Sequence, residues 1–245
     1  MKPILWQWGP VAIYAYGFFL AFGFILAHQL ATREAGRRGM DQRNVSGLGL
    51  LCFITGVIGA RLFFAAQHFS YFRYHPLDII RLDQGGLVWY GAVILAVSAA
   101  IPYMKLKGMG VAMTADLSAP FIALAQGFGR VGCFFNGCCY GIPAKAPWGV
   151  QFPDSHVARL PVQLYSAIFL FLLALILYVV FKRRGRPGRV ICLYGFLYGA
   201  GRFLIEFLRG DQLHYAGLSL PQWMSLGLLA ITAWVWFWYQ RPSEA

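Results

Sequence analysis

Apolar runs of about 20 residues recur along the whole chain, and no other feature of the sequence restricts its fold as strongly. A helix that crosses a bilayer needs roughly 20 consecutive, mainly apolar residues. Hydrophobic residues are 59% of the 245 and charged residues only 12%, whereas a typical soluble domain has about 25% charged residues. We therefore predict an all-α, polytopic membrane protein that forms a single transmembrane domain over residues 1–245. Its seven transmembrane helices are expected at 10–30, 46–66, 87–104, 114–135, 162–181, 189–208 and 219–240.

The formal net charge of +12 suggests a nucleic-acid partner at first sight. In a membrane protein, basic residues gather instead in the cytoplasmic connections between helices. Of the 21 Lys and Arg residues, twelve fall in the connections after the first, third, fifth and seventh runs when Arg189, at the edge of the sixth run, is counted with them, and six in the others. This bias predicts an external N-terminus, a cytoplasmic C-terminus and an extracytoplasmic loop at about 136–161. The lipid bilayer, and no nucleic acid, is the expected surrounding.

Given this orientation, the polar residues within the runs share one depth, near the outer ends of their helices. An ionised side chain at the bilayer centre costs at least about 2.5–3.5 kcal/mol, so several arginines in one layer need a reason. Guanidinium groups are permanently charged and fork onto phosphate oxygens. Arginines that face the outer leaflet therefore indicate a site for a phospholipid headgroup. The residues of this layer are Tyr16, Arg61, Tyr90, Arg130, Arg202 and Glu206.

Three of these residues have simpler explanations that stay open. Arg61 can extend its charged end toward the headgroups from a helix end. Arg202 has Glu206 at i+4 on the same helix face, so the two can form a purely structural ion pair. Arg130 has no carboxylate within one helical turn, which favours a functional role for it.

Cys133, Cys138 and Cys139 lie at or beyond the outer end of the fourth run, where the compartment is oxidising. A disulfide between Cys133 and either of the other two is sterically allowed, but spacing does not decide it. A reactive thiolate near Arg130 is a further option. A zinc site would normally need a fourth ligand, and no usual ligand pattern forms with His156, so no metal is expected.

The stretch GRVGCFFNGCCYG (129–141) resembles the signature of the prolipoprotein diacylglyceryl transferase family, G-R-x-G-N-F-x-N-G-E-x-x-G. The resemblance extends along nearly the whole chain, and seven spans with an external N-terminus is also the architecture of that family. The other matching stretches, in the family's order, are GPVAIYAYG (9–17), GARLFF (59–64), DQGGLVWYGA (83–92), ADLSAPF (115–121), RLPVQLYSA (159–167) and YGAGRFLIEFLRG (198–210).

The resemblance implies a transferase of the bacterial cytoplasmic (inner) membrane that acts in lipoprotein biosynthesis without a cofactor. It would move a diacylglyceryl group from phosphatidylglycerol to the lipobox cysteine in a prolipoprotein signal peptide. Glycerol phosphate would leave. By the resemblance, Arg130 and Arg202 would hold the lipid phosphate and Glu206 would orient Arg202. The further residues expected to bind substrate are Tyr16, Arg61, Asn136, Gly141 and Tyr198.

The chain departs from the family pattern at the expected chemistry. Tyr90 stands where the family usually has histidine, Cys133 and Cys138 replace asparagine and glutamate, and Leu160 replaces a second histidine. With an ordinary pKa near ~10, a tyrosine is a poor base unless a nearby arginine lowers that pKa. We therefore hypothesise that Tyr90 orients or deprotonates the attacking thiol and counts, with the two arginines, among the catalytic residues.

The same departures leave alternatives open. The lipid group could go to another acceptor, or Cys138 could attack first and form a covalent lipid–enzyme intermediate. The chain could also be a catalytically altered phospholipid-binding membrane protein. Transporters usually show inverted repeats and broken helices, and the sequence shows neither.

Overall fold

The computed structural model describes residues 3–8, 11–81, 86–145, 147–153, 155–183, 185–210 and 214–240. Residues 9–10 and 83–85 of the stretches quoted above, and positions 146 and 154 of the loop 136–161, lie outside this part of the chain. The elements are β1 (Ile4–Trp8), β2 (Val11–Tyr14), α1 (Ala15–Arg37), α2 (Gln42–Gln67), α3 (Phe69–Phe72), η1 (Pro76–Ile80), α4 (Trp89–Leu106), α5 (Val111–Asn136), α6 (Val162–Lys182), α7 (Arg189–Glu206), β3 (His214–Tyr215), β4 (Leu218–Ser219) and α8 (Leu220–Gln240).

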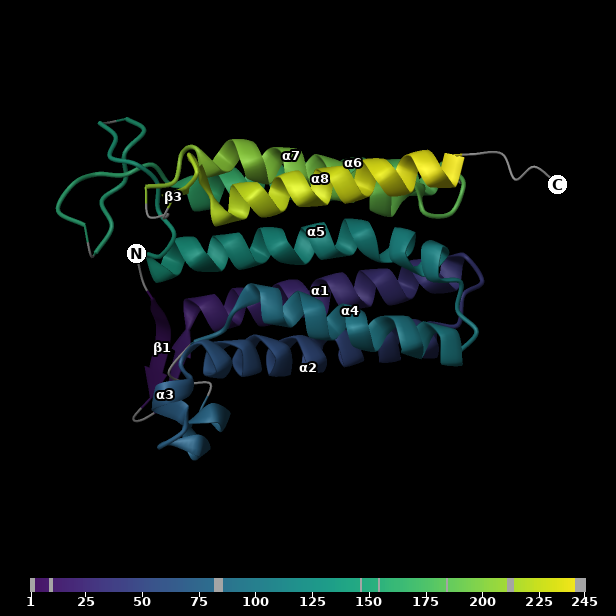
Figure 1. Ribbon diagram of the computed structural model, residues 1–245, viewed down its shortest axis with the longest axis horizontal. Coiled ribbons are helices and arrows are strands. Elements are labelled where there is room, and N and C mark those ends of the chain that lie inside the picture. Colours follow the sequence, from purple (N-terminus) through teal and green to yellow (C-terminus); the bar gives the residue numbers. More distant parts are fainter. Residues whose placement is uncertain are drawn as a thin grey trace. The chain divides into compact units, whose positions relative to one another are not determined.

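Each of the seven predicted runs overlaps one long helix (Figure 1). The largest difference is at the first run, which was expected to be helical from residue 10 but is helical only from Ala15. The preceding residues form an antiparallel hairpin in which Trp8 pairs with Val11 and Ile4 with Tyr14. Aromatic and β-branched residues dominate both strands and suit a pleated, partly exposed surface.

Six of the long helices are long and apolar enough to cross a membrane: α1, α2, α4, α5, α6 and α8. The seventh, α7, contains Arg189, Arg202 and Glu206 within 18 residues. Helices of this length and composition mean that the chain is a membrane protein. Apart from two small hairpins, the described residues give an all-helical fold.

The two faces of helix α6 indicate which medium surrounds the helices. One of its faces is buried against the protein through Leu170, Leu173 and Leu177. Its other face exposes side chains that are just as apolar, with Leu172 54% and Leu175 59% exposed. A helix that is apolar on every side is stable only when both its protein-facing and its outward surfaces are in an apolar medium. Lipid is the medium that meets this condition on the outer face.

The chain forms two compact units, Met1–Ala31 with Ala115–Ala245, and Thr32–Thr114. In the second unit, α2 and α4 pack closely because Gly59 faces Gly91. A Cβ on either glycine would lie 2.3 Å from the other's carbonyl oxygen, so neither position accepts a side chain without separating the helices.

In the first unit, α7 packs against both α6 and α8 (Figure 1). The N-terminus of α7 is tied to α5, since the buried Asp116 carboxylate accepts hydrogen bonds from the backbone N–H groups of Gly188 (2.7 Å) and Ile191 (2.8 Å). A carboxylate at this place satisfies backbone donors that have no partner within the helix. This contact fixes one end of the unit and leaves the polar residues of interest at the other.

Candidate functional site

The candidate site lies at the end of the first unit where α1, α6 and α8 begin and α5 and α7 end. Contacts between these termini establish the arrangement. Gly132 near the end of α5 lies against the start of α1, because a Cβ there would come within 3.2 Å of the Tyr16 Cα. Gln163 at the start of α6 donates a 2.6 Å hydrogen bond to the carbonyl oxygen of Cys138, two residues beyond α5.

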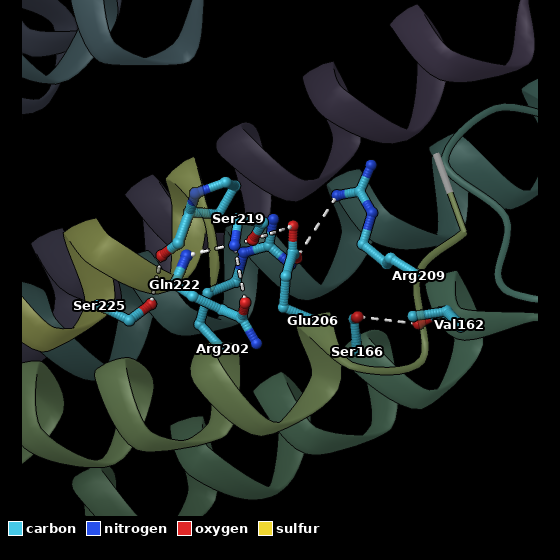
Figure 2. A network of polar contacts seen from close by, with 9 residues as sticks. Val162, Ser166, Arg202, Glu206, Arg209, Ser219, Gln222 and Ser225 are labelled. Carbon is cyan, nitrogen blue, oxygen red and sulfur yellow. Dashed lines mark hydrogen bonds and ion pairs between the residues drawn. The ribbon is translucent and has the colours of Figure 1, made fainter. Parts of the chain in front are cut away.

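Glu206, the last residue of α7, organises the charges at this end. Its side chain is 1% exposed and lies between Arg202 and Arg209 (Figure 2). The carboxylate forms an ion pair with Arg202, as the i+4 spacing predicted, and its Oε2 lies 4.0 Å from Nη1 of Arg209. The hydroxyl of Ser219 donates to Oε1 at 3.3 Å. Glu206 therefore fixes two arginine side chains at once and is itself fixed from the start of α8.

The Ser219 end of this network is closed by Gln222 (Figure 2). The backbone N–H of Ser219 donates to Oε1 of Gln222 at 2.8 Å, and the backbone N–H of Gln222 donates to the Ser219 hydroxyl at 3.4 Å. This is a reciprocal cap at a helix N-terminus. It holds the Ser219 hydroxyl where Glu206 needs a donor.

Arg130 projects from α5 at the same end. It lies close enough to Arg202 for their like charges to interact. Arg202 also interacts electrostatically with Arg209 and Tyr198. Three guanidinium groups and one carboxylate in this region leave an excess of positive charge, which attracts an anionic group.

The predicted aromatic residues also lie here. Tyr16 interacts electrostatically with Arg130 and with the cysteine cluster. Tyr198 stacks on Tyr194 with ring centroids 5.4 Å apart. Tyr194 in turn donates a 3.0 Å hydrogen bond to Gln126, which ties α7 to α5. The structure thus gathers Tyr16, Tyr198 and Arg130 in one region.

The segment after α5 follows a path that depends on backbone conformations rare for most residues. Gly137 has φ 76° and Cys139 has φ 65°. The left-handed region suits glycine, but for another residue it costs about 1–2 kcal/mol. At Gly141 a Cβ would lie 2.5 Å from Val162 and 2.6 Å from a main-chain oxygen. Glycine is therefore required at 141, as the family signature implies.

The loop beyond Gly141 is anchored by Arg159 and Phe152. Nε of Arg159 donates to the Ser155 hydroxyl at 2.9 Å and its guanidinium lies 4.9 Å from the Tyr140 ring. Phe152 is almost completely buried between Phe134 and Tyr140. Beyond Asn136, the last residue of α5, the described residues of the loop up to 161 contain neither a helix nor a named strand, yet they are held onto the end of α5.

The sulfur atoms of Cys133, Cys138 and Cys139 all lie within 4.8 Å of one another. The three cysteines are free, so neither alternative of the disulfide is formed. Contacts with the thiols of Cys133 and Cys138 lower the pKa of the Cys139 thiol, and the charges of Arg209 and Arg130 act in the same direction. Asn136 at the end of α5 lies beside the Cys138 thiol.

Arg61 and Tyr90 belong to the other unit of the chain. Arg61 is buried, and its guanidinium donates hydrogen bonds to the carbonyl oxygens of Ile79 (2.8 Å), Arg81 (2.7 Å), Gly86 (3.3 Å) and Asp78. These bonds fasten the segment after α3 and give Arg61 a structural role. Its role in substrate binding remains a prediction.

Tyr90 is the second residue of α4 and its ring meets that of Trp89 edge-on, with centroids 5.5 Å apart. The next residue, Gly91, is the point of close approach to α2. The start of α4 is therefore firmly placed within its unit. The catalytic role of Tyr90 also remains a prediction.

Sequence reasoning assigned no role to Arg209 or Arg159. Arg209 faces Glu206, while Arg159 donates to the Gly141 carbonyl oxygen at 3.3 Å. Both lie in connections between the long apolar runs. Basic residues are common there, so the sequence did not single out these two. The spacing of Arg209 from Glu206, i+3, was the available signal.

Fold and site together define a polytopic membrane protein with a cluster of arginines and thiols where its helices begin and end. The chain matches the family model for prolipoprotein diacylglyceryl transferase over residues 3–238. It therefore belongs to this family.

Named relatives cover nearly the full length of the chain. It is 37% identical over 241 residues to the phosphatidylglycerol–prolipoprotein diacylglyceryl transferase of Clostridium tetani, covering 96% of each chain. It is 34% identical to transferase 2 of that name from Clostridium perfringens, covering 94% of this chain and 92% of the relative. A Bacillus cytotoxicus enzyme of the same name is 33% identical, with 91% and 87% covered.

Proposed function

We propose that this chain is a transferase that moves the diacylglyceryl group of phosphatidylglycerol to the thiol of the lipobox cysteine in a prolipoprotein. The names of its full-length relatives support the donor and the acceptor. The observation that carries the proposal is the arginine cluster. Arg130 and Arg202 come from different helices, and Glu206 holds Arg202 in place.

The proposed reaction is a displacement at the glycerol carbon that bears the phosphate. The thiolate sulfur forms the new bond to this carbon, the carbon–oxygen bond breaks, and glycerol phosphate leaves with the electron pair. Negative charge grows on the leaving phosphate, so fixed guanidinium donors stabilise the transition state more than the bound lipid. One such donor contributes roughly 2.7–4 kcal/mol at comparable sites.

Glu206 contributes by preorganisation. A free arginine side chain would lose rotamer freedom when it meets the phosphate. Here Arg202 is already restrained by the buried carboxylate, which is fixed from α8 by Ser219. Tyr16, Asn136, Gly141 and Tyr198 complete the proposed substrate site, while Tyr90 orients or deprotonates the acceptor thiol.

For the membrane topology we propose seven spans, with α7 as the sixth along the chain, an external N-terminus and a cytoplasmic C-terminus. The bias of basic residues supports this orientation. The three charged residues of α7 are compatible with a span, since Arg202 and Glu206 neutralise one another within the helix. The proposed location is the inner membrane, with residues 1–245 as one transmembrane domain and the loop 136–161 outside.

The direct test is complementation of a bacterial strain depleted of its own transferase, combined with a purified assay. The assay supplies mass-labelled phosphatidylglycerol and a lipobox peptide, with a Cys-to-Ser peptide as control. We expect the diacylglyceryl mass on the cysteine peptide alone, together with release of glycerol phosphate. Label on another molecule would mean a different acceptor. Bound phospholipid without glycerol phosphate release would identify a lipid-binding protein and contradict the proposal.

A further inference from the structure

The cysteine cluster is the only group of three or more Cys, His, Asp or Glu side chains in the described parts of the chain whose ligand atoms converge closely enough for a metal ion. Its three sulfurs lie within 4.8 Å of one another. In a tetrahedral zinc–thiolate site, bonds of about 2.3 Å put the sulfurs about 3.8 Å apart. The observed upper limit of 4.8 Å exceeds this spacing by about 1 Å.

The backbone is built to bring these thiols together. Cys133 lies in the last turn of α5, and the chain then turns back so that Cys138 and Cys139 face it. Cys139 adopts a left-handed conformation with φ 65°, and residues held in such conformations cluster at functional sites. The Cys138 carbonyl is fixed by Gln163, whose side chain is 1% exposed.

We propose that Cys133, Cys138 and Cys139 bind a zinc ion whose fourth position takes the thiol of the acceptor cysteine. This inference rests on the proposed function, because the acceptor is the prolipoprotein thiol. Zinc sites with three protein ligands and one open position are the catalytic kind, whereas structural sites have four. Sequence spacing argued against a metal because a fourth ligand was missing, but the acceptor supplies it.

A zinc ion at this site would account for how the attacking thiol is deprotonated in this chain. The attacking thiol must lose its proton, yet tyrosine and cysteine stand where the family usually has histidine and glutamate. A thiol that coordinates zinc is deprotonated outright. Its proton passes to solvent, which leaves Tyr90 only the orienting part of its proposed role. The bound thiolate then attacks the glycerol carbon, and glycerol phosphate leaves with the electrons of the broken carbon–oxygen bond. The thioether product is a weaker ligand and dissociates, which reopens the fourth position.

Nearby charge favours a thiolate-rich complex. A zinc ion with four thiolates carries a net charge of −2, which is costly to place near a membrane without counter-charge. Arg130 and Arg209 both lie close enough to Cys139 to interact electrostatically with it. Arg130 is also the proposed phosphate ligand, so the same residue would keep the nucleophile and the phosphate-bearing carbon near one another.

The test uses the full chain, purified in detergent under a mild reductant. We expect one zinc ion per chain by elemental analysis, and thiolate-to-cobalt charge-transfer absorption after replacement with Co(II). Cys138→Ser and Cys139→Ser should each lose the metal, while Cys52→Ser, a matched change in α2, should keep it. Should the cluster variants fail to fold, metal content and Co(II) spectra of the unchanged protein still decide the question.

The fourth position is tested by adding peptides to the Co(II) protein. A lipobox peptide with cysteine should intensify the charge-transfer band, whereas the serine peptide should not. Chelation should abolish transfer and added Zn(II) should restore it. The inference would be overturned by a protein without metal, or by metal that remains bound after both cluster substitutions. It would also be overturned by a Cys133–Cys138 disulfide in the active protein, or by a Co(II) spectrum that does not change when the cysteine peptide is added.

The outcomes separate this inference from the proposed function. Diacylglyceryl transfer by a metal-free protein would leave the function standing and overturn the zinc site. Arg202→Lys should retain one zinc ion and the response to the cysteine peptide but lose transfer, because it disturbs only the phosphate. A protein that binds zinc and the cysteine peptide without any transfer would refute the function instead.

Discussion

Replacing Glu206 by glutamine tests the organising role of its carboxylate. The substitution keeps the size of the side chain and removes the charge, so Arg202 and Arg209 lose their shared anion. Their side chains are only 17% and 9% exposed, so solvent replaces the lost partner poorly. Removing one member of a buried ion pair costs about 3–5 kcal/mol. We expect Glu206→Gln to lose this amount of stability.

Glu34 provides a matched control. It is also a buried glutamate with two arginine neighbours, Arg37 at 3.4 Å and Arg38 at 3.5 Å, but it lies in α1 far along the chain from the site. Glu34→Gln should therefore lower the stability as well. At a temperature where both variants remain folded, only Glu206→Gln should reduce transfer from phosphatidylglycerol.

The assay combines thermal unfolding in lipid nanodiscs with single-turnover transfer to a lipobox peptide. Because the arginines lose preorganisation but keep their charge, the turnover of Glu206→Gln should fall about 10–100-fold, less than the 10²–10³-fold loss typical of a missing oxyanion donor. Equal activity losses in the two variants would mean that instability alone explains the effect. Unchanged transfer by Glu206→Gln would refute the proposed role.

Three further predictions follow from the packing. Gly141→Ala should lower the stability by about 1–3 kcal/mol and also slow transfer, because its Cβ would lie 2.6 Å from a main-chain oxygen. The control Gly227→Ala has open space around it and should change neither quantity, as measured by unfolding in nanodiscs and by the transfer assay. Gln163→Leu should cost about 1–3 kcal/mol and slow transfer, since it leaves the Cys138 carbonyl without its 2.6 Å donor; unaltered unfolding would contradict this. Arg61→Lys should lower the unfolding temperature, because one ammonium group cannot serve four carbonyl oxygens; an unchanged transition would show that these bonds contribute little.

The apolar runs predicted six of the seven long helices closely, because segment length and hydropathy are local properties. The hairpin before α1 was missed, since its residues are as apolar as the helix that follows and only strand pairing distinguishes them. The ion pair of Arg202 with Glu206 was predicted and is confirmed, because i+4 spacing alone brings the two together.

Contacts between distant segments could not be read in the same way. Arg61 binds carbonyl oxygens 17 to 25 residues away, and every residue has such a group. The convergence of the three thiols depends on the left-handed backbone of Cys139, and this conformation cannot be predicted from the presence of a cysteine. The role of Gln163 depends on where α6 begins relative to the end of α5.

A double-mutant cycle on Arg130 and Arg202 tests the central claim most directly. Turnover with phosphatidylglycerol is measured for Arg130→Lys, Arg202→Lys and the pair. If both guanidinium groups stabilise one leaving phosphate, each single variant should lose about 10²–10³-fold, and the pair should depart from the product by an interaction of about 0.5–3 kcal/mol. Strictly multiplicative losses, or single variants that keep their turnover, would contradict a shared phosphate.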